Sequence, residues 1–295
     1  MAAHDHDHDH GYDYEAWSDE QATATVTVDG HDLEMAYYDS AENGDGGDSD
    51  GDPVLLLHGI PTNSFLWRQV APPLADDRRV IVPDLVGYGN SASHDGFDRS
   101  IRAQKQAIGD LVEELGLDTV SFVSHDIGSG VALRYAAHEP DRVGKLVVSN
   151  GTCYDSWPVD FVTNLGLPST AEMDREEFEE TVSSAFSQGT YEEADREFVS
   201  GMTTPWLREG GRRALARAAV STNTNHTTEI EYEDIDADLL CLWGADDSFQ
   251  PIEYGERLAD DLDGEIVRLD EAYHWVVEDR TEAYREELEA FLLDD

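Results

Sequence analysis

Residues 124–130 constrain the fold more than any other part of the sequence. They read Ser-His-Asp-Ile-Gly-Ser-Gly and directly follow the apolar run at residues 119–123. A buried strand that runs through small residues into a helical pattern must turn sharply, and it exposes the side chain at the centre of the turn. That central residue is Asp126, rather than Ser or Cys. We therefore expect a strand, a tight turn that presents Asp126, and a helix.

Strand-like and helix-like segments alternate over much of the chain. Alternating or continuous apolar patterns mark strands at residues 22–28, 33–38, 53–58, 79–83, 119–123, 145–149, 239–243 and 265–269. Helical patterns follow Asp126 to about residue 138 and also fall at residues 65–74, 101–115, 252–262 and 281–292. Strands that are separated by helices form parallel sheets with helices on both faces. The sequence therefore predicts an α/β protein with a mostly parallel central sheet.

The pattern changes between residues 151 and 233, where helical segments at 173–186, 191–202 and 205–220 follow one another with few strand signals. We expect residues 151–233 to form a helical cap inserted into a core of residues 21–150 and 234–295. Residues 1–20 begin with an alternating His/Asp tract and are expected to form a flexible acidic tail. A tract without a scaffold holds a metal ion weakly, so no metal site is expected there. Residues 43–52 have the composition of an exposed loop.

Charge limits the partners that this chain can have. It carries 65 acidic and 19 basic side chains, for a formal net charge of −46. Such a charge repels itself in dilute buffer unless salt screens it, so the composition is typical of a protein from a halophile. Nucleic acids and anionic membranes are excluded as partners on the same grounds. The two cysteines indicate no disulfide framework. Without a signal-peptide pattern or a spanning apolar run, a cytoplasmic location is expected.

Three residues fall in the chain order that nucleophilic hydrolases require, which is nucleophile, acid and histidine. Asp126 occupies the exposed turn. The segment at residues 243–251 places Asp246 and Asp247 in the turn after a strand, and Asp247 is preferred as the acid. His274 follows the last strand and is the candidate base.

Five segments together resemble an aspartate-nucleophile α/β-hydrolase, similar to haloalkane dehalogenases and epoxide hydrolases. They lie at residues 58–68, 84–91, 124–130, 243–251 and around His274, within a match that runs from about residue 53 to 292. The resemblance implies the α/β-hydrolase fold with a helical cap, no cofactor, and attack by Asp126 on a saturated carbon to form an ester. It further implies that His274 activates water, that Asp247 orients His274, and that the backbone N–H groups of Ile60 and Ile127 form the oxyanion hole.

The leaving group stays open. Haloalkane dehalogenases are expected to hold the halide with a Trp immediately after the nucleophile, but Ile127 stands there. Trp157 or Trp206 could donate an indole N–H from the cap instead. Epoxide hydrolases protonate the ring oxygen with cap tyrosines, for which Tyr154 and Tyr191 are the candidates.

The favoured function is thus hydrolysis of a small apolar substrate at a saturated carbon, in the manner of a haloalkane dehalogenase. Epoxide hydrolysis is the alternative, and a non-catalytic ligand-binding protein on the same fold is the third hypothesis. Nothing in the sequence indicates an oligomeric state.

Overall fold

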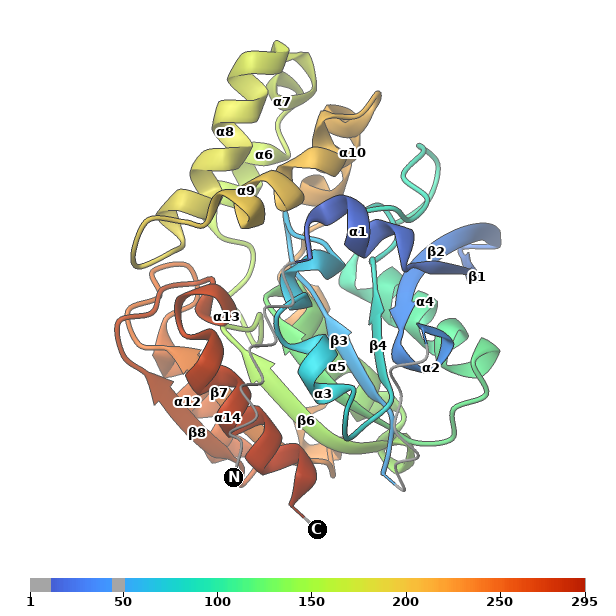
Figure 1. The fold of residues 1–295 in the computed structure, drawn as a ribbon, viewed down its shortest axis with the longest axis vertical. Coiled ribbons are helices and arrows are strands. Elements are labelled where there is room, and N and C mark those ends of the chain that lie inside the picture. Colours follow the sequence, from blue (N-terminus) through green and yellow to red (C-terminus); the bar gives the residue numbers. More distant parts are fainter. Residues whose placement is uncertain (1–11, 44–50, 295) are drawn as a thin grey trace, which may run out of the picture.

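The structure, a computed structural model, describes residues 12–43 and 51–294 (Figure 1). Its centre is an eight-stranded sheet in the order β1-β2-β4-β3-β5-β6-β7-β8. The strands are β1 (Ala22–Val28), β2 (His31–Asp39), β3 (Val54–Leu57), β4 (Val80–Pro83), β5 (Val120–His125), β6 (Val143–Ser149), β7 (Asp238–Gly244) and β8 (Glu265–Leu269). β2 runs antiparallel to both of its neighbours, β1 and β4, and all remaining pairs of neighbouring strands are parallel. The predicted mostly parallel sheet is confirmed.

Helices cover both faces of this sheet. In Figure 1, α3 (Ala71–Leu74) and α14 (Thr281–Leu293) lie in front of it, and α4 (Ile101–Glu114), α5 (Ile127–His138) and α12 (Ile252–Asp261) lie behind. The central strands β3 and β5 are buried at every residue. Strands covered on both sides need apolar residues at both faces, which is why their sequences are continuous apolar runs rather than alternating ones.

Between β6 and β7 the chain forms a group of helices at the top of Figure 1. They are α6 (Asp160–Leu165), α7 (Pro168–Glu172), α8 (Arg175–Gln188), α9 (Arg196–Thr203) and α10 (Gly211–Val220), and they are followed by α11 (Asn225–Thr228), which contacts α5. The short 3₁₀ helices η3 (Thr204–Leu207) and η4 (Tyr232–Asp234) complete the segment. The indole N–H of Trp206 donates to the carbonyl of Pro61 at 2.6 Å, which ties these helices to the loop after β3.

Two of the helices predicted in this segment are wrong at their ends. The helix expected from residue 191 begins only at Arg196, because the Asp195 side chain caps it by accepting from the Phe198 N–H. The helix expected over residues 205–220 is broken into η3 and α10. The break falls at Gly210, whose φ of 83° lies in the left-handed region.

The expected flexible tail is wrong for its last residues, because α1 (Tyr14–Asp19) packs on the core. Trp17 is fully buried, its indole N–H donates to Ser64 Oγ at 3.0 Å, and its ring stacks on Tyr38 with centroids 4.9 Å apart. A single aromatic anchor of this kind gives no periodic signal in so short a segment. The His/Asp tract and most of the expected loop at residues 43–52 lie outside the described residues.

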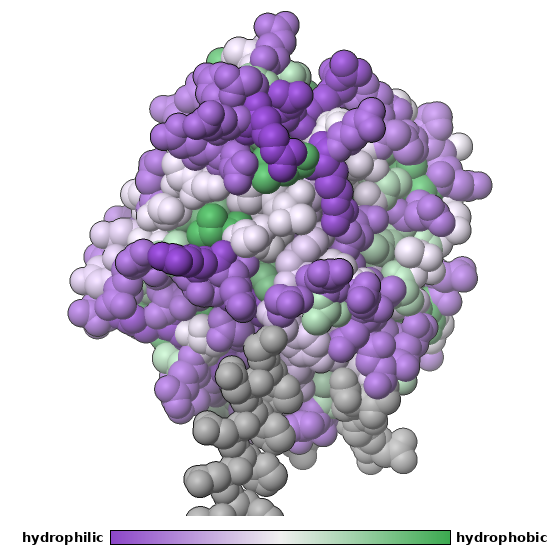
Figure 2. Space-filling view, turned by 45° about the horizontal axis from the view of Figure 1, so that its top comes forward, coloured by the Kyte–Doolittle hydropathy of each residue, from purple (hydrophilic) through white to green (hydrophobic). Residues whose placement is uncertain are grey.

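The remaining short elements are α2 (Ser40–Asn43), α13 (Val276–Asp279), η1 (Ser64–Trp67) and η2 (Pro140–Arg142). No described helix combines the length and apolar character that a membrane crossing requires. Hydrophilic residues dominate the face shown in Figure 2, in keeping with acidic residues spread along the whole chain.

The parallel register brings several strand ends to one edge of the sheet. Leu57 of β3 pairs with Ser124 of β5, and Ser149 of β6 pairs with His125 and with Leu242 of β7. The residues that follow these strands therefore emerge side by side at the carboxyl edge, which is where open α/β sheets bind ligands.

Candidate active site

Asp126 occupies a sharp turn between β5 and α5, with φ 52° and ψ −124°. This conformation is unfavourable for a residue with a side chain, and such strain is concentrated at functional sites. The turn needs two close backbone approaches. A Cβ on Gly128 would lie 2.5 Å from the carbonyl oxygen of Leu57, and one on Gly59 would lie 2.3 Å from Asp126 Oδ1. Glycine at both positions lets the loop after β3 meet the turn.

The structure brings together Asp126, Asp247 and His274, the three residues singled out by chain order. His274 Nδ1 lies 2.9 Å from Asp247 Oδ2, and His274 Nε2 lies 3.7 Å from Asp126 Oδ2. All three side chains are buried. If Nδ1 donates its proton to Asp247, the unprotonated Nε2 faces Asp126, which is the tautomer that a general base needs.

Backbone N–H groups hold the other oxygen of the Asp126 carboxylate. The Ile60 N–H donates to Asp126 Oδ1 at 2.7 Å, and the Ile127 N–H also bonds to this carboxylate. Two backbone N–H donors on this carboxylate are the kind of group that forms an oxyanion hole. Asp126 Oδ2 is left facing His274.

Burial and charge act on the titration of this cluster in opposite directions. Burial raises the pKa of Asp126 to about 6. His274 and the two N–H donors stabilise the ionised carboxylate and so act in the opposite direction, but burial outweighs them. Burial also lowers the pKa of His274, but the Asp247 and Asp126 carboxylates outweigh it, so the pKa is raised above its usual value. Burial opposes ionisation of Asp247, yet His274 and the hydrogen bonds from Asn150 and Phe249 keep its pKa low.

His125 supports the base rather than acting as one. Its Nε2 lies 2.8 Å from the carbonyl oxygen of His274 and can donate to it. Burial lowers the pKa of His125 to about 3, so the ring is neutral and fixes the backbone of His274.

A small cavity of about 20 Å³ lies against Asp126 and His274. Its volume is close to that of one water molecule. Its other polar lining residues are Trp157 and Gln250. The rest of the lining is apolar and comes from Ile60, Pro61, Val159, Phe161, Val162, Ala185, Phe249 and Trp275. Side chains from the segment between β6 and β7 thus form part of the cavity wall.

Of the four substrate-binding candidates, only Trp157 lines this cavity. It is buried, and its indole N–H has no hydrogen-bond partner among the described residues. The Trp206 indole is engaged by Pro61, and the Tyr154 hydroxyl donates to Asp261 at 2.7 Å beside a separate surface pocket. Tyr191 is 39% exposed and packs on Tyr273. The structure therefore does not bring Trp206, Tyr154 or Tyr191 to Asp126.

Two residues at the site were not identified from the sequence as part of it. Asn150 directly follows β6, and its Nδ2 donates to Asp247 Oδ2 at 2.6 Å while its Oδ1 accepts from the Gly244 N–H at 3.0 Å. Gln250 follows the acid loop and lines the cavity. Their positions after β6 and β7 could have marked them as candidate site residues, because the ends of these strands meet at the carboxyl edge of the sheet.

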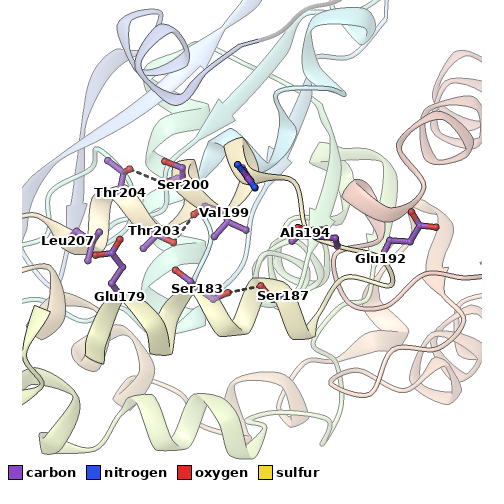
Figure 3. Close-up of a pocket in the computed structure, with 12 residues that line it drawn as sticks. Glu179, Ser183, Ser187, Glu192, Ala194, Val199, Ser200, Thr203, Thr204 and Leu207 are labelled. Atoms are coloured by element: carbon purple, nitrogen blue, oxygen red, sulfur yellow. Dashed lines mark hydrogen bonds between the residues drawn. The ribbon is translucent and has the colours of Figure 1, made fainter. Parts of the chain in front are cut away.

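A larger groove of about 440 Å³ runs between α8 and α9, away from Asp126 (Figure 3). Its threonine hydroxyls bond to their own helix, Thr203 to the carbonyl of Val199 and Thr204 to that of Ser200. No His or Cys lines it. Elsewhere too, the described part of the chain places no three His, Cys, Asp or Glu side chains so that they could hold a metal ion. The Asp126 cavity is the better candidate for chemistry.

Comparison with known proteins agrees with the fold described above. The alpha/beta hydrolase fold family matches residues 52–281. A haloalkane dehalogenase of Mycolicibacterium paratuberculosis is 42% identical over 121 residues, which are 40% of this chain and 38% of that protein. The chain thus spans less than half the length of the curated relatives it matches.

Solved structures resemble the chain over most of its length. An alpha/beta hydrolase fold protein from Burkholderia ambifaria has a TM-score of 0.79 at 26% identity and covers 90% of this chain and 96% of its own. The haloalkane dehalogenase DbeA from Bradyrhizobium elkani has a TM-score of 0.74 at 21% identity, covers 92% of this chain and 98% of its own, and speaks for the fold alone.

Proposed function

This chain belongs to the alpha/beta hydrolase fold family, and on that basis we propose that it hydrolyses a carbon–halogen bond at a saturated carbon through an ester on Asp126. One observation carries the proposal. Asp126 presents Oδ2 toward the His274 imidazole while the Ile60 N–H holds Oδ1. A carboxylate at this position suits attack on saturated carbon, because the resulting alkyl ester can be hydrolysed at its carbonyl.

In the first step, Asp126 Oδ2 attacks the carbon that bears the halogen. The carbon–oxygen bond forms as the carbon–halogen bond breaks, and the halogen leaves with the bonding electrons as halide. The unpartnered indole N–H of Trp157 is the available donor to that halide in an otherwise largely apolar cavity.

In the second step, water attacks the ester carbonyl carbon of Asp126. His274 Nε2 takes the proton from this water, and Asp247 stabilises the imidazolium through Nδ1–H. Negative charge develops on Oδ1, to which the Ile60 N–H donates, and the Ile127 N–H is the second donor to this carboxyl group. Collapse of the intermediate releases the alkoxide, which takes the proton from His274 and leaves as the alcohol. Asp126 is left as a carboxylic acid that holds the oxygen and the second proton of the water, and release of this proton to solvent restores the carboxylate.

Epoxide hydrolysis is the second candidate, since Asp126 could open an epoxide in the same way. It requires an acid near the ring oxygen, and the cap tyrosines Tyr154 and Tyr191 do not line the cavity. The position of Trp157 therefore favours halide over epoxide oxygen as the leaving group.

We further propose that residues 151–233 act as a cap on a core formed by residues 21–150 and 234–295. Trp157, Val159, Val162 and Ala185 come from this segment and cover Asp126. Because the cavity holds only about one water molecule, a substrate enters when these side chains move aside.

A trapping experiment tests the nucleophile and the leaving group together. His274→Gln removes the base but leaves Asp126 able to attack, so the alkyl ester should accumulate. The variant is incubated in high salt with short 1-bromoalkanes or with styrene oxide, and peptide mass spectrometry locates the added mass.

Alkylation of the peptide that holds Asp126 by a bromoalkane is the expected result. The double variant with Asp126→Asn serves as the control and should gain no mass. An adduct with styrene oxide alone would establish the epoxide alternative. The absence of any adduct on folded protein would move the assignment to the ligand-binding hypothesis.

A further inference from the structure

Gln250 is a fully buried residue whose carboxamide has no hydrogen-bond partner among the described residues, at Nε2 or at Oε1. Its backbone is fixed, because the Trp243 indole donates to the Gln250 carbonyl at 2.8 Å. The neighbouring Phe249 ring meets the His274 ring edge-on at 5.4 Å. Gln250 thus places both a donor and an acceptor at the wall of the cavity that contains Asp126 and His274.

Another buried glutamine shows how this fold treats a purely structural carboxamide. Gln104 of α4 is also fully buried, yet its Oε1 accepts from the Val86 N–H at 3.0 Å and its Nε2 donates to the Val86 carbonyl at 2.8 Å. A buried amide without partners is unfavourable, and most native proteins avoid it. The difference shows that Gln250 has free hydrogen-bonding capacity beside the cavity, which Gln104 does not have.

The proposed reaction leaves no other use for this carboxamide. Asp126 and His274 carry the bond-making steps, and Trp157 faces the halide. A plain haloalkane would leave both polar atoms of Gln250 unpaired in a closed site. A carboxylate on the substrate would face the Oε1 lone pairs and the Asp126 charge. A neutral carboxamide can donate to Oε1 and accept from Nε2 at the same time.

We propose that Gln250 is a specificity-determining residue that pairs with a neutral carboxamide group of the substrate. The substrate class is short organohalides that carry a primary amide, rather than the wholly apolar compounds expected from the sequence. The hydrolysis of such a substrate rests on the proposed function, whereas the pairing of Gln250 with a carboxamide does not.

A matched pair of substrates tests the reaction. 3-Bromopropanamide and 1-bromo-3-methylbutane have the same skeleton, with the amide replaced by an isopropyl group. Halide release should be faster for the amide in the wild-type protein, by tenfold or more in kcat/KM. Gln250→Met keeps the side-chain length but removes both polar atoms, so the preference should vanish through loss of activity on the amide alone. Gln104→Met is the matched control and should keep the preference.

Calorimetric measurement of butanamide binding distinguishes the proposed hydrolysis of organohalides from the proposed role of Gln250. The wild-type protein should bind it at least tenfold more tightly than Gln250→Met. If no organohalide is hydrolysed but this difference in binding holds, the proposed function fails and the role of Gln250 stands. Equal affinity for butanamide, or equal loss of both substrates in Gln250→Met, would overturn the assignment of Gln250.

Discussion

At the scale of single residues, the ionisation of Asp126 decides when the proposed reaction can begin. In that reaction its carboxylate must be charged to attack, and burial raises its pKa to about 6. The Ile60 and Ile127 N–H groups and His274 hold the ionised form in place. The proposed nucleophile therefore titrates closer to neutral pH than an ordinary aspartate does.

This pKa predicts an acidic limb in the rate of the first step. The folded protein protonates Asp126 as the pH falls through about 6, so halide release in the first turnover should be roughly tenfold slower at pH 5 than at pH 8. Rapid-quench measurement of halide over this range checks it. A rate that holds steady down to pH 4 would contradict the prediction. Ester hydrolysis should fall as well, because His274 also becomes protonated and has a raised pKa.

Sequence order was enough to select Asp126, Asp247 and His274, since each follows a strand whose carboxyl end must reach the same edge. It was not enough for Asn150 or Gln250, whose roles depend on which side chains surround them. Trp157 and Trp206 were indistinguishable in the sequence. Only the packed structure shows that Pro61 occupies the Trp206 indole while Trp157 faces the cavity.

At the scale of elements, the contact between α5 and the end of β3 shapes the turn. Alternating strands and helices were enough to predict the sheet and its flanking helices. The ends of α9 and α10 depended on a cap at Asp195 and on the conformation of Gly210. The helix α1 depended on one buried tryptophan. The apolar patterns in the sequence therefore predicted whether a segment is a helix or a strand better than they predicted its first and last residues.

Gly128→Ala should disrupt this contact. The new methyl group would lie 2.5 Å from the Leu57 carbonyl oxygen and 2.6 Å from that of His58, and backbone cannot rotate away as a side chain can. The free energy of unfolding should fall by about 1–3 kcal/mol, and activity should be lost as the turn shifts. Denaturant unfolding and halide release provide the two measurements.

Gly109→Ala is the paired control, in the interior of α4. Its nearest neighbour, Tyr135 Cε2, lies 3.8 Å away at ordinary contact distance, so stability should be unchanged or rise by about 0.5–1 kcal/mol. Similar losses in both variants would show that the close approach at Gly128 is not the cause.

At the scale of the whole molecule, net charge is the dominant property. The formal charge of −46 comes from acidic residues spread along the chain, and hydrophilic residues dominate the face in Figure 2. We propose that this charge reflects adaptation to a salt-rich medium. Screening shortens the reach of repulsion from about 10 Å at 0.1 M salt to about 3 Å at 1 M.

The thermal unfolding midpoint should therefore increase from 0.1 M to 2 M potassium chloride. Sucrose at equal osmolality, which does not screen charge, should raise it less. A midpoint that is level or lower in high salt, or an equal effect of sucrose, would exclude charge screening as the source of stability.

The walls of the cavity come from two parts of the chain, one that holds the proposed reacting groups and one that limits which molecules fit. Ile60, Asp126 and His274 lie in the loops and turns that follow strands, whereas Val159, Phe161, Val162 and Ala185 come from the segment between β6 and β7. Selection can therefore alter which molecules fit by changing the second set while the first is inherited intact. Related proteins with this arrangement can therefore differ in substrate range while they share one catalytic mechanism.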